Sequence, residues 1–372
     1  LLSTLFKASW RFQARDPVLP PRNWWDLLQL TTAVRPDTLV TVPYTLSTVG
    51  DALRFTGQGK NQRLRTFLDL QLKLYSQVNA EETALLYAAT ALSVSQEPQG
   101  LYHLEGSMQV LSDRLVESLE RDGGKLLMRH TVENIKVENN QVSVVTIRNQ
   151  KTGESWTESV DHVVANVTVQ NLVQLLGEKA PQGYKKRVEK LPPSSGAFVI
   201  YLGVDESAIP PECPPHLQFL YDANGPIGEN NSLFVSVSRP DDGRAPQGKA
   251  TIIASSFVDA EKWWNIEKYD DLKQQFTQEA LTKLSKFFYL KPETIIHVEA
   301  ATPRTFYTFT GRDKGIVGGI GQRVPTFGPF GFANRTPINN LWLVGDSTHP
   351  GEGTAGVSYS ALTVVRQIAV SS

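Results

Sequence analysis

The sequence is poor in the residues that build cross-linked or metal-binding proteins. It holds one cysteine, Cys213, among 372 residues. One cysteine cannot form an internal disulfide, which excludes a scaffold held by its own disulfides. Nothing close to Cys213 in sequence activates its thiol, and this favours a structural role. The six histidines lack the spacing of a helical metal site, so no metal centre is predicted.

Charge excess and long apolar runs are also missing. The formal net charge is -1, so no basic surface is predicted to bind nucleic acid. No stretch approaches the roughly 20 consecutive apolar residues of a membrane-spanning helix. The first residues, LLSTLFKASWRF, have neither an initiator methionine nor the layout of a signal peptide, which indicates the remainder of a longer chain.

Two glycine-rich stretches fail as nucleotide-binding motifs. The run GIVGGIGQRVPTFG, residues 315–328, lacks the third glycine of a GxGxxG turn, and Pro325 forbids the helix that must follow. The run TGQGKNQ is not a phosphate-binding P-loop, because Asn61 stands where Ser or Thr binds magnesium. The chain therefore has no dinucleotide fingerprint of its own.

What the sequence does contain is a change of pattern along its length, in a chain long enough for two domains or one composite one. Apolar positions recur at helical spacing over residues 24–30, 61–75 and 81–94, which predicts a mostly helical start. Ser107 is a suitable N-cap for a helix with its apolar face on Val110, Leu111, Leu115 and Leu119. Strands are predicted at 132–137 and 142–147, joined by a hairpin at Asn139-Asn140, and at 160–164.

The middle and the end of the chain differ again. Alternating runs at 197–204, 232–238 and 250–257 predict antiparallel strands, followed by a helix over 269–288 and a strand over 295–298. The last block, LWLVGDSTHPGEGTAGVSYSALTVV, begins with a continuously apolar strand, Leu341 to Val344, and ends in a helix with Val357, Ala361, Val364, Val365 and Ile368 on one face. Its glycine-rich loop thus lies between a strand end and a helix start, where α/β folds bind ligands.

A flavin would use each feature of this loop. Asp346 can accept hydrogen bonds from ribityl hydroxyls, and Gly345, Gly351, Gly353 and Gly356 let the backbone approach a flat ring. The free N–H groups at the helix start, expected at residues 355–358, stabilise negative charge on a reduced flavin. The same pattern is also typical of a loop whose glycines only turn corners. His349 has no visible carboxylate partner, which argues against a role as general base.

The run NLWLVGDSTHPGEGTAGVSYSALTVVRQI resembles the C-terminal flavin signature of the phytoene-desaturase-like branch of the amine-oxidase superfamily. Its GDSTHPGEGTAGVSYSA portion is most similar to bacterial, especially cyanobacterial, carotenoid 3',4'-desaturases, with carotenoid isomerases and retinol saturases as close relatives. Two further stretches agree: residues 100–142, and DHVVANVTVQNLVQLLG followed by SSGAFVIYLGVD. The resemblance covers most of residues 99–372, and residues 1–98 fit only loosely.

The resemblance implies an α/β, or α+β composite, fold: a Rossmann-like FAD-binding domain that lacks its N-terminal βαβ unit, with an inserted substrate domain of antiparallel sheet and helices. Residues 1–98 would form a helical part of the substrate or membrane-facing region, 99–170 and 306–372 the FAD-binding domain, and 171–305 the substrate domain. FAD contacts are implied for the following residues: Val132, Gly345, Asp346, Pro350, Gly351, Gly353, Gly356 and Val357.

The implied activity is an FAD-dependent desaturation of a carotenoid, with a quinone or oxygen as electron acceptor. A carotenoid cis–trans isomerase that uses reduced flavin is the close alternative, and a non-catalytic polyene- or lipid-binding remnant is another. The sequence HPGEGTAG is less similar to amine oxidases or porphyrinogen oxidases. Trp24-Trp25 with Leu27, Leu28 and Leu30 can contact a membrane interface, although such clusters are more often core. The expected location is peripheral, on the cytoplasmic side of a membrane.

Overall fold

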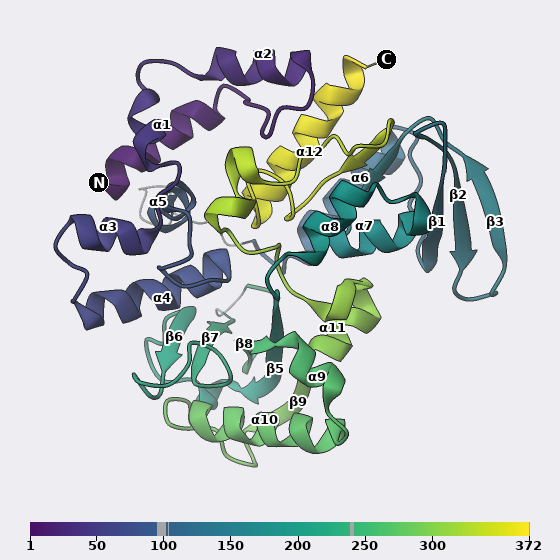
Figure 1. The fold of residues 1–372 in the computed structure, drawn as a ribbon. Helices are drawn as coiled ribbons and strands as arrows, with labels where there is room; N and C mark the ends of the chain where they lie inside the picture. Colours follow the sequence, from purple (N-terminus) through teal and green to yellow (C-terminus); the bar gives the residue numbers. More distant parts are fainter. Residues whose placement is uncertain (95–101, 103, 239–241, 372) are drawn as a thin grey trace. The chain divides into compact units, whose positions relative to one another are not determined.

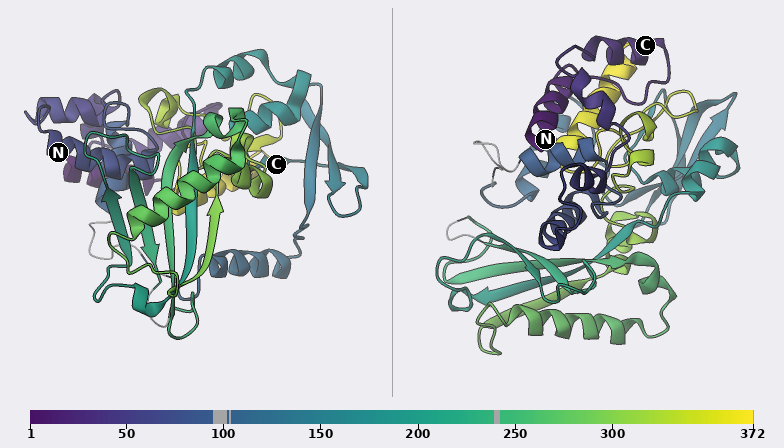
Figure 2. Two further views of the ribbon diagram at one scale, coloured as in Figure 1. Left: turned by 90° about the horizontal axis from the view of Figure 1, so that it is seen from below. Right: turned by 60° about the vertical axis from the view of Figure 1, so that its left-hand side comes forward.

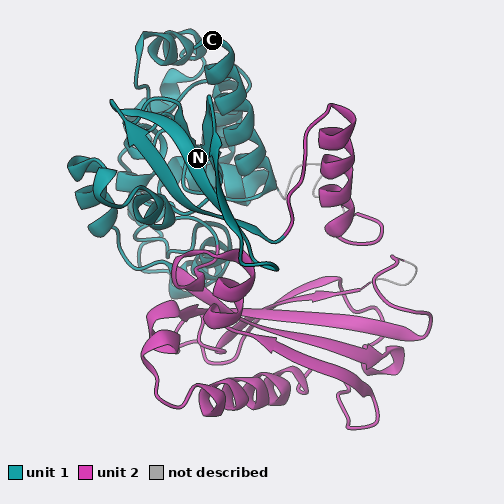
Figure 3. Cartoon of the chain, turned by 90° about the vertical axis from the view of Figure 1, so that its right-hand side faces the viewer, with its two compact units in different colours: residues 1–100, 129–194, 318–372 teal, residues 101–128, 195–317 magenta. Residues whose placement is uncertain are grey.

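The computed structural model describes residues 1–94, 102, 104–238 and 242–371. The chain divides into two compact units (Figure 3). Unit 1 comprises residues 1–100, 129–194 and 318–372, and unit 2 comprises residues 101–128 and 195–317. These boundaries differ from those of the four predicted segments, since residues 171–194 cluster with unit 1 and residues 101–128 with unit 2.

Unit 1 begins with helices, as the sequence predicts (Figure 1). They are α1 (Leu2–Gln13), α2 (Trp24–Ala33), the 3-10 helix η1 (Leu39–Tyr44), α3 (Val49–Phe55), α4 (Gln62–Ser76) and α5 (Leu85–Val94). Asn61 caps α4 by accepting a hydrogen bond from the backbone of Leu64. The predicted start of α5 at Glu81 is wrong by four residues, because the Ala84 N–H donates to the Gln322 carbonyl instead of joining a helix.

A three-stranded antiparallel sheet follows in unit 1. It consists of β1 (His130–Glu138), β2 (Gln141–Asn149) and β3 (Ser155–Ser159). The predicted hairpin is confirmed, with Asn139 at φ 50° and Asn140 at φ 60°. The polar strand β3 was not predicted, because the sequence SWTES has no apolar alternation.

The remainder of unit 1 packs helices against a short parallel pair of strands. The elements are β4 (Val163–Ala165), α7 (Val169–Leu176), η2 (Gly177–Lys179), α8 (Gln182–Glu189), η5 (Val324–Thr326), η6 (Gly328–Phe330), β10 (Leu341–Leu343) and α12 (Thr354–Ala369). Strand β4 begins at Val163, three residues later than predicted, and pairs with β10 in parallel. Leu341 and Leu343 of β10 pack with Leu172 of α7 in one apolar core.

Unit 2 is built around a five-stranded antiparallel sheet with the order β6-β7-β8-β5-β9. Its elements are α6 (Gln109–Arg121), β5 (Ser195–Asp205), η3 (Glu206–Ala208), β6 (His216–Leu220), β7 (Ser232–Val237), β8 (Lys249–Asp259), α9 (Ala260–Asn265), α10 (Tyr269–Leu284), β9 (Ile295–Ala301), α11 (Pro303–Thr310) and η4 (Asp313–Gly315). Helix α10 lies along one face of the sheet (Figure 2). Phe198, Trp263 and Phe276 meet in the core between them.

Two helix predictions in unit 2 need correction. Helix α6 is capped by Met108 rather than Ser107, although the Ser107 hydroxyl still accepts a hydrogen bond from the Gln109 N–H at 3.1 Å. Its predicted apolar face is not buried, and Leu115 is 63% exposed. The helix predicted over 269–288 ends at Leu284. Gly100 and Leu101, which begin the second resembling stretch, lie outside the described residues.

No helix among the described residues combines the length and the apolar character needed to cross a bilayer.

Candidate flavin-binding site

The C-terminal strand, loop and helix form the candidate site in unit 1. Strand β10 is fully buried, as predicted, and within the described residues its sheet has one other strand, β4. Because the two strands are parallel, their carboxyl ends lie at the same edge, where the Val344 N–H donates to the Ala165 carbonyl at 3.0 Å. The loop of residues 344–353, called the flavin loop below, therefore begins at the edge where α/β folds place ligands.

The face that helix α12 buries is not the predicted one. Val365 is 63% exposed, and the buried positions are Gly356, Ser360, Thr363, Val364 and Gln367. Two of these polar side chains are buried because they have partners. Ser360 bonds to the flavin loop, and the Gln367 amide donates to the buried Asp26 carboxylate at 3.0 Å.

A buried hydrogen-bond network holds the start of the flavin loop. The Asn334 amide donates to the Leu343 carbonyl at 2.8 Å, to the Ser360 hydroxyl at 3.0 Å and to the Thr348 hydroxyl at 3.3 Å. The Gly345 N–H donates to the Ser360 hydroxyl at 3.1 Å, and Thr348 donates to the Gly345 carbonyl at 2.9 Å. These bonds join β10, the flavin loop and α12 into one unit, so the loop conformation is set before any ligand binds.

Most of the predicted glycines are required by the packing of the loop itself. A Cβ on Gly345 would lie 2.5 Å from the Asn166 side chain, and a Cβ on Gly356 would lie 2.4 Å from the Gly351 carbonyl. Gly351, at φ 116°, lies against the Gln322 side chain. Gly353 is different, since it has φ 92° and its Cβ position faces open space. The alternative interpretation of the loop, that its glycines only shape the chain, thus explains three of the four.

The rejected glycine run at 315–328 packs onto the flavin loop. A Cβ on Gly319 would lie 2.4 Å from the Asp346 carbonyl, so only glycine allows this approach. The neighbouring Gly318 lies against Gln77, whose amide donates to the Glu352 carboxylate at 2.8 Å. The sequence predicted none of these contacts, and the Gly318-Gly319 pair was the one signal that could have revealed them.

His349 is a buried, uncharged side chain. It is 5% exposed, and burial lowers its pKa to about 3, so the imidazole is neutral at physiological pH. The Gln13 amide nitrogen lies 2.7 Å from its Nε2, which makes Nε2 the acceptor and places the ring proton on Nδ1. The rings of Phe327 and Tyr359 both lie close to the imidazole, with centroids 5.8 Å and 6.3 Å away. This environment agrees with the weak case for His349 as a general base.

The surroundings of the flavin loop fit a planar heterocycle that carries both N–H and C=O groups. In the described part of the chain, Gln13 Oε1, Gln77 Oε1 and His349 Nδ1 are buried without a hydrogen-bond partner. The two oxygens can accept hydrogen bonds from such a ring, and the Nδ1–H group can donate one.

The start of α12 offers free backbone N–H groups. The first intrahelical bond there runs from the Val357 N–H to the Gly353 carbonyl at 3.0 Å. The free N–H groups are therefore those of residues 354–356 rather than 355–358, and Gly353 to Ala355 are exposed.

The other predicted contacts are placed as follows. Pro350 follows a cis peptide bond within the flavin loop, and Val357 lies in the first turns of α12. Asp346 is half-buried, and the Ser347 hydroxyl lies 3.4 Å from its carboxylate. Val132 is 40% exposed on β1, where it pairs with Ile147. None of the contacts described for Val132 reaches the flavin loop, so its role at the adenine stays a prediction.

A model of the family described as flavin containing amine oxidoreductase matches residues 33–369. The chain belongs to this family. The match agrees with the geometry of the flavin loop and supports FAD as the cofactor, as the sequence predicted. The residues that would hold it are those around the flavin loop and the start of α12.

Curated relatives of the chain include an isomerase and a desaturase. Prolycopene isomerase 2 from an Oncidium hybrid cultivar is 28% identical over 83% of this chain and 53% of that protein. The 1-hydroxycarotenoid 3,4-desaturase from a Flavobacterium species is 27% identical over 68% of this chain and 52% of that protein. The chain thus spans about half the length of the curated relatives it matches.

Solved structures confirm the predicted fold class. An oxidoreductase from Methanosarcina mazei matches with a TM-score of 0.61 at 17% identity, over 93% of this chain and 73% of that one. Putrescine oxidase bound to putrescine matches with a TM-score of 0.60 at 13% identity, over 99% and 75% of the two chains. The mixed helix-and-sheet architecture, with its antiparallel sheets, is therefore that of the flavin amine oxidoreductases.

Proposed function

We propose that this chain is part of an FAD-dependent desaturase that introduces a double bond into a carotenoid, of the 3',4' type. The observation that carries the proposal is the flavin loop, whose sequence resembles that branch of the family and whose polar network is preformed. The carotenoid-related names of the relatives support the same substrate class. Bound FAD supplies the acceptor for a hydride from an allylic C–H bond while a proton leaves the neighbouring carbon.

The residues of this chain act by positioning and by electrostatics. The free N–H groups at the start of α12 and the positive end of its dipole favour negative charge beside the flavin loop. They would stabilise the negative charge of a reduced flavin held there. The neutral His349 adds no charge there. The two electrons must then leave through an acceptor such as a quinone or oxygen.

The sheet of unit 2 offers a wall for a long apolar substrate. Along β8 the fully buried positions alternate with half-buried ones, and the buried set belongs to the core with α10. The opposite face carries the half-buried Tyr201, Phe234 and Ile253. The polar Ser255 and Glu299 lie beside them on the same face. Sites for apolar ligands commonly combine such apolar side chains with a few polar groups.

An isomerase is the second candidate, because the prolycopene isomerases match a larger share of this chain than the desaturase does. The product mass separates the two activities. Incubation of the complete gene product with a carotenoid should give a product two hydrogens lighter. A product of unchanged mass and altered geometry would replace the desaturase with the isomerase. A protein that shows no flavin absorbance and retains the carotenoid without changing it would favour a binding protein.

We also propose peripheral contact with the cytoplasmic side of a membrane through α2 and η1. Their exposed apolar side chains include Trp24 at 78% exposure, Leu28 at 47% and Val42 at 60%. Aromatic and aliphatic side chains of this kind partition into the bilayer interface. In a vesicle sedimentation assay, the double substitution Trp24→Ala and Leu28→Ala should lower the bound fraction severalfold. Equal binding of the variant and the unaltered protein would contradict this contact.

A further inference from the structure

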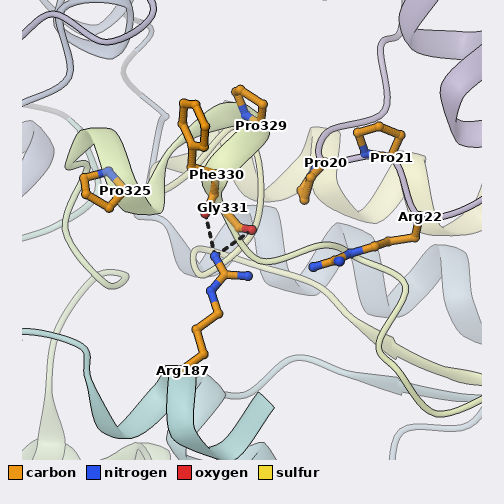
Figure 4. A pocket seen from close by; sticks show the side chains of 8 residues that line it. All are labelled: Pro20, Pro21, Arg22, Arg187, Pro325, Pro329, Phe330 and Gly331. Atoms are coloured by element: carbon orange, nitrogen blue, oxygen red, sulfur yellow. Dashed lines mark hydrogen bonds between the residues drawn. The ribbon is translucent and has the colours of Figure 1, made fainter. Parts of the chain in front are cut away.

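Unit 1 contains a cavity apart from the flavin loop. It has a volume of about 500 Å³, and its walls include Pro20, Pro21, Pro329 and Phe330 (Figure 4). No residue of the flavin loop lines it. Prolines and short turns hold these walls, so the cavity does not depend on long flexible side chains for its shape.

Two arginines reach into this cavity from different elements. Arg22 comes from the turn before α2 and Arg187 from α8, and Figure 4 shows their guanidinium ends pointing toward one another. No carboxylate is among the described residues that line the cavity. Two like charges that face each other without an acid form an unfavourable arrangement, which an anion between them would relieve.

Arg187 is held in place by the protein. Its Nη2 donates to the Phe330 and Gly331 carbonyls, the latter at 2.9 Å, and its guanidinium lies 4.0 Å from the centre of the Phe332 ring. Burial lowers the pKa of Arg187, and the nearby Arg22 lowers it further. Its Nε and Nη1 have no hydrogen-bond partner among the described residues, so two of its three nitrogens remain for a ligand.

Arg22 has a fixed backbone and an uncommitted side chain. Its N–H donates to the Asp26 carboxylate at 3.0 Å, which anchors the turn. Within the described residues its guanidinium forms neither an ion pair nor a hydrogen bond. Asp26 cannot neutralise it fully, because that buried carboxylate is already paired with Arg335 at 3.1 Å. Arg22 is therefore available to a ligand at no loss of internal contacts.

Tyr184 adds a third polar group beside the two arginines. It lies one helical turn before Arg187 on α8 and packs against the same Phe332 ring. Its hydroxyl is buried without a hydrogen-bond partner in the described structure. Burial raises its pKa, and the positive charges of Arg187 and Arg22 partly oppose that rise.

We propose that this cavity binds a phosphate group between Arg22 and Arg187. The two free nitrogens of Arg187 and the whole Arg22 fork offer more donors than the two oxygens of a carboxylate can accept, whereas a phosphate has more oxygen atoms to share between the two side chains. The group can belong to a soluble phosphate compound or to a lipid headgroup, because both present the same chemistry. The site is independent of the proposed carotenoid chemistry.

Titration with inorganic phosphate tests the proposal. The complete gene product, saturated with FAD and held at constant ionic strength, should show a phosphate-dependent rise in melting temperature. Arg22→Ala should weaken phosphate binding at least tenfold, because it removes one charge of the pair without disturbing any internal contact. Arg187→Lys keeps the positive charge and loses the planar guanidinium, so it should weaken phosphate binding less than Arg22→Ala does.

The matched control is Arg35→Ala, which removes another exposed arginine that does not line the cavity. It should bind phosphate as the unaltered protein does. Equal phosphate affinity in the Arg22→Ala and Arg35→Ala proteins would overturn the proposal, and so would a melting temperature that phosphate does not change.

Vesicles identify the source of the phosphate. Phosphatidylcholine vesicles with and without phosphatidic acid should be compared, using the same variants. If phosphatidic acid increases binding, and Arg22→Ala but not Arg35→Ala removes the increase, the ligand is a lipid headgroup. If only inorganic phosphate binds in an Arg22-dependent way, the ligand is a soluble phosphate compound. Both outcomes support the site, and loss of Arg22 dependence in both assays contradicts it.

Discussion

The two units bury different kinds of side chain. The centre of unit 2 is apolar and largely aromatic, with Phe198, Trp263 and Phe276 packed between the sheet and α10. The candidate site in unit 1 buries Asn334, Thr348 and Ser360 at 0–3% exposure. Apolar burial stabilises a fold without specifying a ligand, whereas a buried polar network fixes the positions of groups that a ligand must meet. The difference is the reason that the proposed cofactor site is placed in unit 1.

The largest expected effect concerns the apolar core of unit 2. Trp263 is fully buried, so Trp263→Ala should lower the free energy of unfolding by about 3–5 kcal/mol. Denaturant titration with fluorescence detection measures this change. The exposed Trp24 provides the control, and Trp24→Ala should change stability by less than about 0.5 kcal/mol. Similar losses in the two variants would mean that the core of unit 2 is not packed as described.

The polar network of unit 1 should respond in a different way. Asn334→Ala removes three hydrogen bonds at the start of the flavin loop, which should cost about 1–3 kcal/mol of stability. Flavin occupancy should fall together with stability, because the loop loses its preset conformation. Asn224→Ala, at an exposed position in unit 2, should leave both unchanged. Full flavin occupancy in the Asn334→Ala protein would show that the hydrogen-bond network is not needed for flavin binding.

A smaller effect should appear in the pH dependence of stability. The pKa of His349 is about 3 in the folded protein against an ordinary value of 6.5, so the unfolded chain takes up a proton that the folded chain does not. Below pH 6.5 this histidine should lower the free energy of unfolding by up to about 1.4 kcal/mol per pH unit. The slope between pH 6 and pH 5 should therefore be shallower in a His349→Asn protein than in the unaltered one. If the free energy of unfolding depended on pH equally in the two proteins, the His349 ring would be exposed to solvent rather than buried.

The sequence predicted the elements with strong local patterns and missed those set by distant contacts. The hairpin at Asn139-Asn140 and the strands β5, β7, β8 and β9 follow from local turn chemistry and alternation, and the structure confirms them. Strand β6 was not predicted. The buried face of α12 was predicted wrongly because apolar spacing was taken as the guide. Ser360 and Gln367 are buried instead, since their partners Asn334 and Asp26 come from elsewhere in the chain.

The candidate site shows the same limit. The Gly-rich strand-to-helix loop was visible as a motif, and the family match agrees with it. Gln13 and Gln77, whose carbonyl oxygens lie buried and unpartnered near that loop, come from the helical start of the chain. No local pattern distinguishes them from other glutamines. Only the folded chain brings them beside His349 and Glu352.

The central claim is that the flavin loop, supported by the 318–319 glycine pair, holds FAD. A matched pair of glycine substitutions in the complete gene product tests it most directly. Gly319→Ala would place a methyl group 2.4 Å from the Asp346 carbonyl, whereas Gly183→Ala on α8 meets no atom within 4 Å. Flavin titration followed by absorbance should show at least a tenfold weaker affinity, about 1.4 kcal/mol, for Gly319→Ala and an unchanged affinity for Gly183→Ala. Equal flavin affinity in the two variants, with both folded, would contradict the account.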